Sequence, residues 1–354
     1  MDLKISDNCQ FCKSKKLQII NFFGYFPTVN DYNKKKLPNQ KLFPMTLLKC
    51  KACELFQLRE IINKKILFPK SYPYTSSTTK ILRDNFNKLS ERLVSNKYIS
   101  RDELLLDIGS NDGNLLSFFK DKCKILGITP ENIGRKAISK GIPTIIDYFN
   151  NKTSKFIKKN YGRCKIITAT NVFAHIDNVN NVLKNIKNIL QNDGIFISEN
   201  HYFLDVIQTV QYDTIYHEHL RYYTLSHLKK LFYKNEMEIF NVEKINTHGG
   251  SIRVYASRRG RFNINPSVKK FLNKEKKLLT NNNLSNFVDK IINSKKEFLK
   301  ILLNLKKQKK LVMGIGAPSR STTLINFTGL NSKLCKYILE INGSHKIGKY
   351  VPAN

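Results

Sequence analysis

Short apolar runs alternate with amphipathic stretches through the middle of the chain. Strands that alternate with helices in this way predict a parallel sheet with helices on both faces, the α/β class. Ligands of such sheets bind at the carboxyl ends of the strands. The apolar runs cover residues 104–108, 124–128, 142–149, 164–172 and 194–200. The helical stretches cover residues 131–140 and 179–190.

Further elements follow this alternating region. The pattern over 225–245 predicts a helix and then a strand, and 248–258 predicts a glycine turn that enters an antiparallel edge strand. A lysine-rich region, 265–309, has apolar residues at helical spacing and predicts solvated helices. Residues 310–330 predict a second strand, glycine turn and helix, and 336–341 the next strand. Because two strands are too few for a stable sheet of their own, we expect this lobe to be incomplete.

The first strand of the alternating region ends in a glycine-rich turn, in the stretch LLLDIGSNDGNLL. Gly109 and Gly113 give the backbone freedom there and allow close approach of a ligand. Asp107 and Asp112 add carboxylates, and the phosphate-binding pattern GxxxxGK[ST] is absent. The turn therefore favours a ligand with hydroxyls or positive charge, such as S-adenosylmethionine, although an ordinary βα turn has the same pattern.

Two Cys-x2-Cys pairs near the start of the chain favour a metal site. The pairs are Cys9 with Cys12 and Cys50 with Cys53, and four thiolates satisfy tetrahedral zinc. Four unrelated reduced cysteines are the alternative. A zinc ribbon alone is also compatible with nucleic-acid binding, so this segment does not decide the function.

The segment 205–224 carries the densest set of reactive side chains. Tyr216, His217, Glu218 and His219 are consecutive, and such residues transfer protons near neutral pH. The segment lacks the HExxH spacing of a helical metal site. Acid–base work is the favoured interpretation, and a metal site or a structural polar cluster are the alternatives.

Composition sets limits on size and location. A chain of 354 residues with 41% hydrophobic residues predicts two or three domains with real cores. The formal charge of +34 is spread along the chain, which fits a compositional habit of the source and attraction of an anionic substrate. No run approaches membrane-spanning length and no signal peptide is recognisable, so a cytoplasmic protein without a membrane partner is expected.

Six motifs in order resemble the sugar C-methyltransferases of deoxysugar and surface-polysaccharide biosynthesis, over essentially the whole chain. The resemblance implies a class I S-adenosylmethionine methyltransferase domain with a Rossmann-like fold at 71–260, a small zinc-binding domain at 1–70, and a helical segment with a truncated C-terminal α/β lobe at 261–354. The motifs are YPYTSS (72–77), DIGSNDGNLL (107–116), NVFAHI (171–176), QYDTIYHEHLRYYTL (211–225), HGGSIRVY (248–255) and GIGAPSRSTTLIN (314–326).

The resemblance implies C-methylation of a nucleotide-linked 4-keto deoxysugar. A base removes the proton beside the ketone, and the enolate takes the methyl group of S-adenosylmethionine. The implied base is His219, assisted by Tyr216 and Glu218, with His175 across the pocket. Such chemistry needs a base that works near neutral pH and a donor to the enolate oxygen.

The same resemblance assigns the binding residues. It implies S-adenosylmethionine and structural Zn²⁺ as cofactors and a nucleotide-diphosphate sugar as partner. The expected cofactor-binding residues are Asp107, Gly109, Ser110, Asn111, Asp112, Gly113, Thr129 and Asn171. The expected substrate-binding residues are Tyr72, Tyr74, His217, His248, Gly250, Arg253 and Arg320. The expected zinc ligands are Cys9, Cys12, Cys50 and Cys53.

Two departures from the family pattern stand out. Thr129 occupies the position of an acidic residue that binds the ribose diol, which predicts weaker cofactor binding or a substitute such as Glu131. Family members also continue beyond the turn at which this chain ends, Pro352-Ala353-Asn354, which predicts a fragment or an impaired protein.

Three alternatives remain open from the sequence. An O- or N-methyltransferase acting on a sugar needs no enolising base. A zinc-ribbon RNA methyltransferase or nucleic-acid binder fits the charge and the cysteine pairs, although no known nucleic-acid-binding module is recognisable. A catalytically inactive homologue is the third. No nucleic-acid partner is expected, and the pattern leaves the oligomeric state open.

Overall fold

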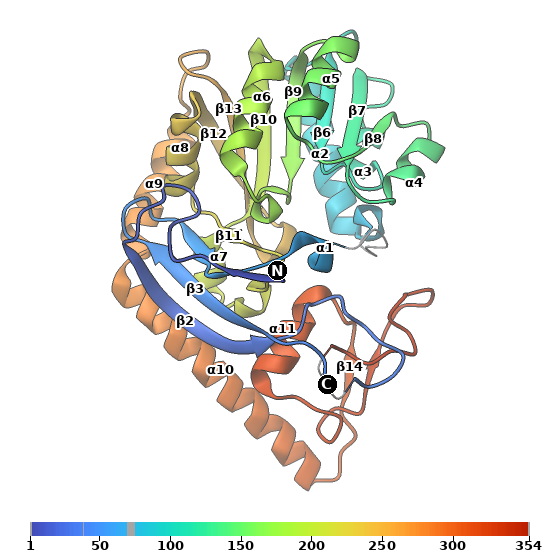
Figure 1. Ribbon diagram of the computed structural model, residues 1–354, viewed down its shortest axis with the longest axis vertical. Helices are drawn as coiled ribbons and strands as arrows, with labels where there is room; N and C mark the ends of the chain where they lie inside the picture. Colours follow the sequence, from blue (N-terminus) through green and yellow to red (C-terminus); the bar gives the residue numbers. More distant parts are fainter. Residues whose placement is uncertain (1, 38, 69–74, 353–354) are drawn as a thin grey trace. The chain divides into compact units, whose positions relative to one another are not determined.

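The computed structural model describes residues 2–37, 39–68 and 75–352. The chain divides into two compact units, each assembled from segments that are distant in the sequence (Figure 1). Unit 1 comprises Met1–Leu67, Phe203–Tyr222 and Leu278–Asn354, and unit 2 comprises Phe68–Tyr202 and Tyr223–Lys277. The division into three consecutive domains remains a prediction.

Unit 2 contains one seven-stranded mixed sheet in the order β12-β13-β10-β9-β6-β7-β8. The neighbours from β10 to β8 pair in parallel, and β13 pairs antiparallel with both β10 and β12. This confirms the predicted α/β class and the class I methyltransferase topology. The strands are β6 (Leu104–Ile108), β7 (Lys124–Thr129), β8 (Thr144–Ile146), β9 (Cys164–Thr170), β10 (Leu190–His201), β12 (Met237–Ile245) and β13 (Ser251–Arg258).

The edge of this sheet differs from the expectation. The sequence assigned the antiparallel edge to 248–258, but β13 lies inside the sheet and β12 forms the edge. Seven of the eight residues of β13 are buried, whereas β12 alternates between buried and half-buried positions. An inner strand covered on both faces is usually a continuous apolar run, but four of the eight residues of β13 are serine or arginine, so the sequence pattern did not mark it as an inner strand.

Helices cover both faces of the sheet. Ile195 and Ile197 pack with Leu82 and Phe86 of α2, while Phe196, on the opposite face of β10, stacks on Phe232 of α8. The helices of unit 2 are α2 (Lys80–Ser95), α3 (Asn114–Ser117), α4 (Gly134–Ser139), α5 (Asn151–Tyr161), α6 (Val179–Ile189), α8 (Leu225–Lys234) and α9 (Pro266–Leu278), with 3-10 turns η1 (Ser76–Thr78), η2 (Phe173–His175) and η4 (Thr247–Gly249).

Unit 1 is organised around a four-stranded antiparallel sheet in the order β11-β4-β3-β2. Its core joins Met45 and Phe56 of this sheet to Phe203 of α7 and Phe287 of α10, so the segment 203–222 shares a core with the cysteine-rich region. The elements are β1 (Leu3–Ile5), β2 (Leu17–Phe26), β3 (Phe43–Cys50), β4 (Phe56–Leu58), β5 (Glu60–Ile62), α1 (Lys64–Leu67), α7 (Phe203–Gln208), η3 (Tyr212–Thr214), β11 (Arg221–Tyr222) and α10 (Asn281–Lys307).

The last described part of unit 1 contains a second strand, turn and helix, as the sequence predicted. β14 (Met313–Ile315) pairs in parallel with β15 (Tyr337–Leu339), and α11 (Ser319–Thr328) connects them. α11 packs against η3, which places it beside the segment with the reactive side chains. Across the described ranges, no helix combines the length and the apolar character that a membrane span requires.

Candidate functional site

The glycine turn after β6 adopts a backbone that requires glycine. Gly109 and Gly113 have φ of 76° and 78°, in the left-handed region. A Cβ on Gly109 would lie 2.4 Å from Cγ2 of Val172, and one on Gly113 would lie 2.7 Å from Cδ1 of Ile142. A side chain at either position would therefore push the turn away from its neighbours.

Three buried side-chain oxygens beyond the carboxyl ends of β6 and β9 fit a polar ligand. Ser110 Oγ, Asp112 Oδ2 and Asn171 Oδ1 accept or donate no hydrogen bond within the described part of the chain. Asp112 has Lys140 Nζ at 3.5 Å as an ion-pair partner. Buried polar groups normally have hydrogen-bond partners. The oxygens therefore match the hydroxyl and amine donors of S-adenosylmethionine.

Ser76, which the sequence did not single out, holds the glycine turn from the other side. Its backbone N–H donates to Asn111 Oδ1 at 3.0 Å, and its hydroxyl donates to Asp112 Oδ1 at 2.7 Å. Asn114 Nδ2 in turn donates to the Ser76 carbonyl at 3.2 Å. The serine- and threonine-rich stretch before α2 was the available signal, and its partners could not be read from it.

Asp107 lies at the end of β6 and is buried. The Thr168 hydroxyl donates to its Oδ1 at 2.6 Å. Burial raises the pKa of the Asp107 carboxyl to about 7, and this effect outweighs the hydrogen bond from Thr168, which lowers it. Asp107 is thus a carboxyl group that can carry a proton near neutral pH.

Thr129 ends β7 and is also buried. Its hydroxyl donates a hydrogen bond to Oε2 of Glu131, two residues along the chain. A carboxylate is therefore present beside the position that carries threonine in place of the expected acidic residue.

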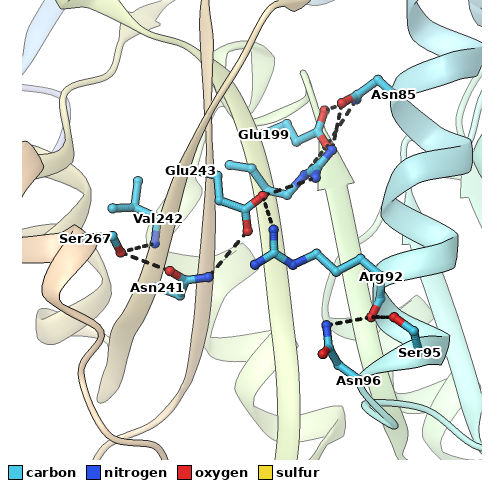
Figure 2. A network of polar contacts seen from close by, with 10 residues as sticks. Asn85, Arg92, Ser95, Asn96, Glu199, Asn241, Val242, Glu243 and Ser267 are labelled. Atoms are coloured by element: carbon cyan, nitrogen blue, oxygen red, sulfur yellow. Dashed lines mark hydrogen bonds and ion pairs between the residues drawn. The ribbon is translucent and has the colours of Figure 1, made fainter.

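The predicted substrate-binding Arg253 lies in a buried network. Its guanidinium pairs with Glu199 at 2.6 Å and donates to Asn85 Oδ1 at 2.8 Å. Asn85 also donates to Glu199, and Glu243 joins Arg92 to the same network (Figure 2). These contacts connect α2, β10, β12 and β13 within unit 2, and the predicted role of Arg253 toward a substrate remains a prediction.

Two predicted histidines of unit 2 sit near the carboxyl ends of its strands. The ring of His175, in η2, meets Phe68 edge-on at 5.4 Å between centroids. His248, in η4, has φ of 53°, and its ring centroid lies 5.1 Å from that of His201. Gly250 follows with φ of 128° and accepts a backbone hydrogen bond from Tyr202.

In unit 1, His219 is buried and held by a backbone carbonyl. Its Nδ1 lies 3.0 Å from the Thr214 oxygen, and its ring centroid lies 4.2 Å from that of Tyr216. Because a carbonyl only accepts, Nδ1 carries the hydrogen and the lone pair of the neutral ring is on Nε2. The ring is therefore oriented and tautomerically defined as a base requires.

The two neighbours of His219 in the motif have different surroundings. Glu218 Oε1 accepts from Asn30 Nδ2 at 2.9 Å, and Asn30 Oδ1 accepts from the Ser319 hydroxyl at 3.1 Å. His217 Nε2 donates to the Pro44 carbonyl at 2.9 Å, and burial lowers the pKa of His217 to about 4. A histidine that stays neutral in this way has a structural environment rather than that of a titrating base.

Arg320, predicted to bind substrate, forms a bidentate ion pair. Its Nε and Nη2 donate to the two carboxylate oxygens of Asp213 at 2.6 and 2.7 Å. This fork geometry is the strong form of the arginine–carboxylate interaction.

The four cysteines form the predicted metal site. Their Sγ atoms all lie within 4.8 Å of one another, with Cys9 and Cys53 at 3.5 Å and Cys12 and Cys50 at 3.6 Å. Four thiolates around zinc at ~2.3 Å lie about 3.8 Å apart. The two Cys-x2-Cys turns are alike, because Lys13 and Glu54 each have φ of 65° and donate back to the carbonyl of the first cysteine. The set fits structural zinc.

The structure thus groups the predicted residues in two sets. Unit 2 carries the expected cofactor-binding residues with His175, His248, Gly250 and Arg253, and unit 1 carries the zinc ligands with Tyr216, His217, Glu218, His219 and Arg320. Tyr72 and Tyr74 lie outside the described residues. Ser76 and Asn30 are the contacts that the sequence missed.

Three family models match consecutive stretches of the chain. Residues 9–68 match the "Putative zinc binding domain", residues 74–241 the "Methyltransferase domain", and residues 246–354 the "C-methyltransferase C-terminal domain". Together they follow the order that the resemblance implied.

The chain is also similar to individual proteins. The C-methyltransferase NovU of Streptomyces niveus is 26% identical over 98% of this chain and 84% of its own. Among solved structures, the plantazolicin methyltransferase BpumL is 14% identical, covering 54% of this chain and 90% of that one with a TM-score of 0.41. The magnesium protoporphyrin IX methyltransferase of Synechocystis is 12% identical, covering 50% and 82%, with a TM-score of 0.38. From the family models and the curated relative, the chain is an S-adenosylmethionine-dependent methyltransferase whose first and last stretches match a putative zinc-binding domain and a C-methyltransferase C-terminal domain.

Proposed function

We propose that this enzyme methylates carbon in a nucleotide-linked 4-keto deoxysugar, in a pathway of deoxysugar or surface-polysaccharide synthesis in the cytoplasm. The observation that carries the proposal is the geometry of His219. Its Nδ1–H is directed to the Thr214 carbonyl, so the lone pair of the neutral ring is on Nε2, the nitrogen that takes the proton in this proposal. An enzyme that methylates oxygen or nitrogen would need no base that removes a proton from carbon.

The reaction begins at the carbon beside the ketone. His219 Nε2 takes the proton, and the electron pair of the broken C–H bond moves onto the carbonyl oxygen as an enolate. A hydrogen-bond donor at that oxygen lowers the barrier, since charge develops there. Tyr216, whose ring lies tilted against that of His219, supplies a hydroxyl from the same segment.

When bound, S-adenosylmethionine supplies the methyl group that the enolate carbon takes. Ser110, Asp112 and Asn171 would hold its polar groups, because their buried oxygens are matched to hydroxyl and amine donors. The residual proton on His219 returns to solvent after the transfer, so the enzyme finishes in its starting state.

Deuterium exchange tests the proposal without methyl transfer. We expect the enzyme, incubated in D2O with a 4-keto nucleotide sugar and S-adenosylhomocysteine, to place deuterium on the carbon beside the ketone. His219→Asn should slow exchange by about 10²–10⁴-fold, the usual contribution of a general base. His227→Asn, at a buried histidine of α8 in unit 2, is the matched control.

The alternatives give different results. An O- or N-methyltransferase would transfer the methyl group to a sugar without any exchange at carbon. Exchange by His219→Asn within about tenfold of the parent would remove His219 from the role of base.

A further inference from the structure

The segment that contains His219 is held by the first turns of α11. Arg320 donates two hydrogen bonds to the carboxylate of Asp213 in η3. The Thr323 hydroxyl donates to the Ile215 carbonyl at 3.5 Å. Ser319 reaches Glu218 through Asn30. All of these contacts lie within unit 1, so they are properties of one compact part of the chain.

The Arg320–Asp213 pair acts on the residue that orients the base. Asp213 and Thr214 are consecutive in η3, and the Thr214 carbonyl accepts the hydrogen of His219 Nδ1. Within η3 the Thr214 N–H and hydroxyl donate to the Gln211 carbonyl and the Ile215 N–H donates to the Tyr212 carbonyl. The ion pair of Asp213 with Arg320 adds an anchor from this turn to α11. Thr214 is buried, whereas the Arg320 side chain is 35% exposed.

We infer that Arg320 is a positioning residue for the base. It fixes Asp213, Asp213 fixes the turn, and the Thr214 carbonyl then keeps His219 in the Nδ1–H tautomer. This differs from a direct contact with an anionic substrate, for which the guanidinium has already committed two of its donor nitrogens. The inference rests on the proposed role of His219, but the tautomer can be measured independently of that role.

Nitrogen-15 NMR of labelled histidine reads the tautomer directly, with His219→Asn used to assign its signals. At alkaline pH, wild type should show a protonated Nδ1 and an unprotonated Nε2 for His219. Arg320→Gln should give a mixture of tautomers. In the exchange reaction kcat should fall by about tenfold with KM changed less than about threefold, a smaller loss than removal of the base itself.

Conservative and reciprocal variants separate positioning from loss of fold. Arg320→Lys keeps the charge but not the fork, so it should recover part of the lost kcat. Asp213→Asn should reproduce the effect of Arg320→Gln, and the double variant should be no worse than either one, since both act through one contact. Arg59→Gln is the matched control, because it breaks another arginine–aspartate pair of unit 1, with Asp7.

The outcomes are distinguishable. A rise in KM with an unchanged His219 tautomer in Arg320→Gln would overturn the inference and assign Arg320 to substrate binding. A wild-type protein without exchange would refute the proposed function, yet the tautomer of His219 in the variants would still decide the role of Arg320. Zinc content and circular dichroism of each variant report whether unit 1 is folded.

Discussion

We propose that Glu131 takes the place of the acidic residue that the sequence lacks at position 129. The Thr129 hydroxyl donates to the Glu131 side chain, which places a carboxyl group beside the end of β7. A ribose diol donates two hydrogen bonds to one carboxylate, whereas a threonine hydroxyl accepts weakly. On this proposal, Glu131 compensates for Thr129 in the binding of an adenosyl ligand.

Calorimetry with S-adenosylhomocysteine tests this role. Glu131→Gln should weaken binding by about 10–100-fold, the loss expected for hydrogen bonds to a charged group. Thr129→Val should cost up to about tenfold, because it releases the carboxylate. Glu91→Gln, at an exposed position on α2, should change nothing. Equal affinity of Glu131→Gln and the parent would show that the diol is bound elsewhere.

Asp107 links stability to pH. Its pKa is about 7 in the folded protein and near 3.8 when unfolded, so the folded state holds a proton that the unfolded state releases between these values. Stability from this group is complete below about pH 4 and is lost as the pH rises through about 7. The full effect over that window is at most about 4 kcal/mol.

Asp107→Asn removes the ionisation and keeps an oxygen for the Thr168 hydroxyl. We expect the free energy of unfolding of wild type, relative to this variant, to decrease between about pH 4 and about pH 7. Urea denaturation at several pH values measures it. A constant difference across the range would mean that Asp107 ionises normally.

The residue types of the site could be predicted, but their partners could not. The motifs gave Gly109, Asp107 and His219 because turns and proton transfer require those residue types. Ser76 and Asn30 contact residues far along the chain, and a single serine or asparagine carries no signal of its distant partner. For the same reason, the sequence could not show that Arg253 pairs with Glu199 or that Arg320 pairs with Asp213.

At the level of elements, the Glu199–Arg253 pair joins β10 to β13. Both side chains are almost wholly buried, so removal of one leaves the other charged and without its partner. Arg253→Met should destabilise the protein by about 3–5 kcal/mol. Thermal unfolding measures this, and Glu199→Gln with Arg253→Met should recover much of the loss because no isolated charge remains.

The outer part of the same network provides the comparison. The Arg92–Glu243 pair is 2.7 Å long, but the Arg92 side chain is 44% exposed. Arg92→Met should therefore cost less than about 1 kcal/mol. If Arg92→Met and Arg253→Met lowered the free energy of unfolding equally, burial would not be the cause of the stability of the Glu199–Arg253 pair.

Elements were predicted where local periodicity decides them. The helix at 179–190 and the strand at 164–172 match α6 and β9 within two residues. The sequence could not predict which strand forms the edge of the sheet or which core residues 203–222 join. A hydrophobic pattern shows that a segment is buried, but it does not show which other segments cover it. Phe203 and Tyr222 pack on the cysteine-rich sheet of unit 1 rather than in unit 2.

For the whole molecule, the two-unit division changes how the motifs are grouped. Unit 1 contains the zinc ligands, residues 216–219 (YHEH) and the glycine turn after β14, although three different sequence regions supply them. These regions are separate in sequence, and they are brought together by strand pairing of β11 with β4 and by the packing of α7, α10 and α11 against the four-stranded sheet.

The net charge of +34 is a property of the whole protein and would attract the anionic substrate proposed above. Screening shortens the reach of this field to about 10 Å at 0.1 M salt, so association with a nucleotide diphosphate should slow as salt is added. We expect kcat/KM for the nucleotide sugar to fall several-fold between about 0.05 and about 0.5 M salt, with kcat nearly constant. Methylthioadenosine, an adenosyl ligand without net charge, is the control and should bind equally at both salt concentrations.

The nucleic-acid alternative predicts tight binding of RNA that weakens as a steep power of salt concentration. RNA that stays bound at physiological salt, together with a salt-independent kcat/KM for the sugar, would favour that alternative, because the positive field would then serve a polyanion rather than a small substrate.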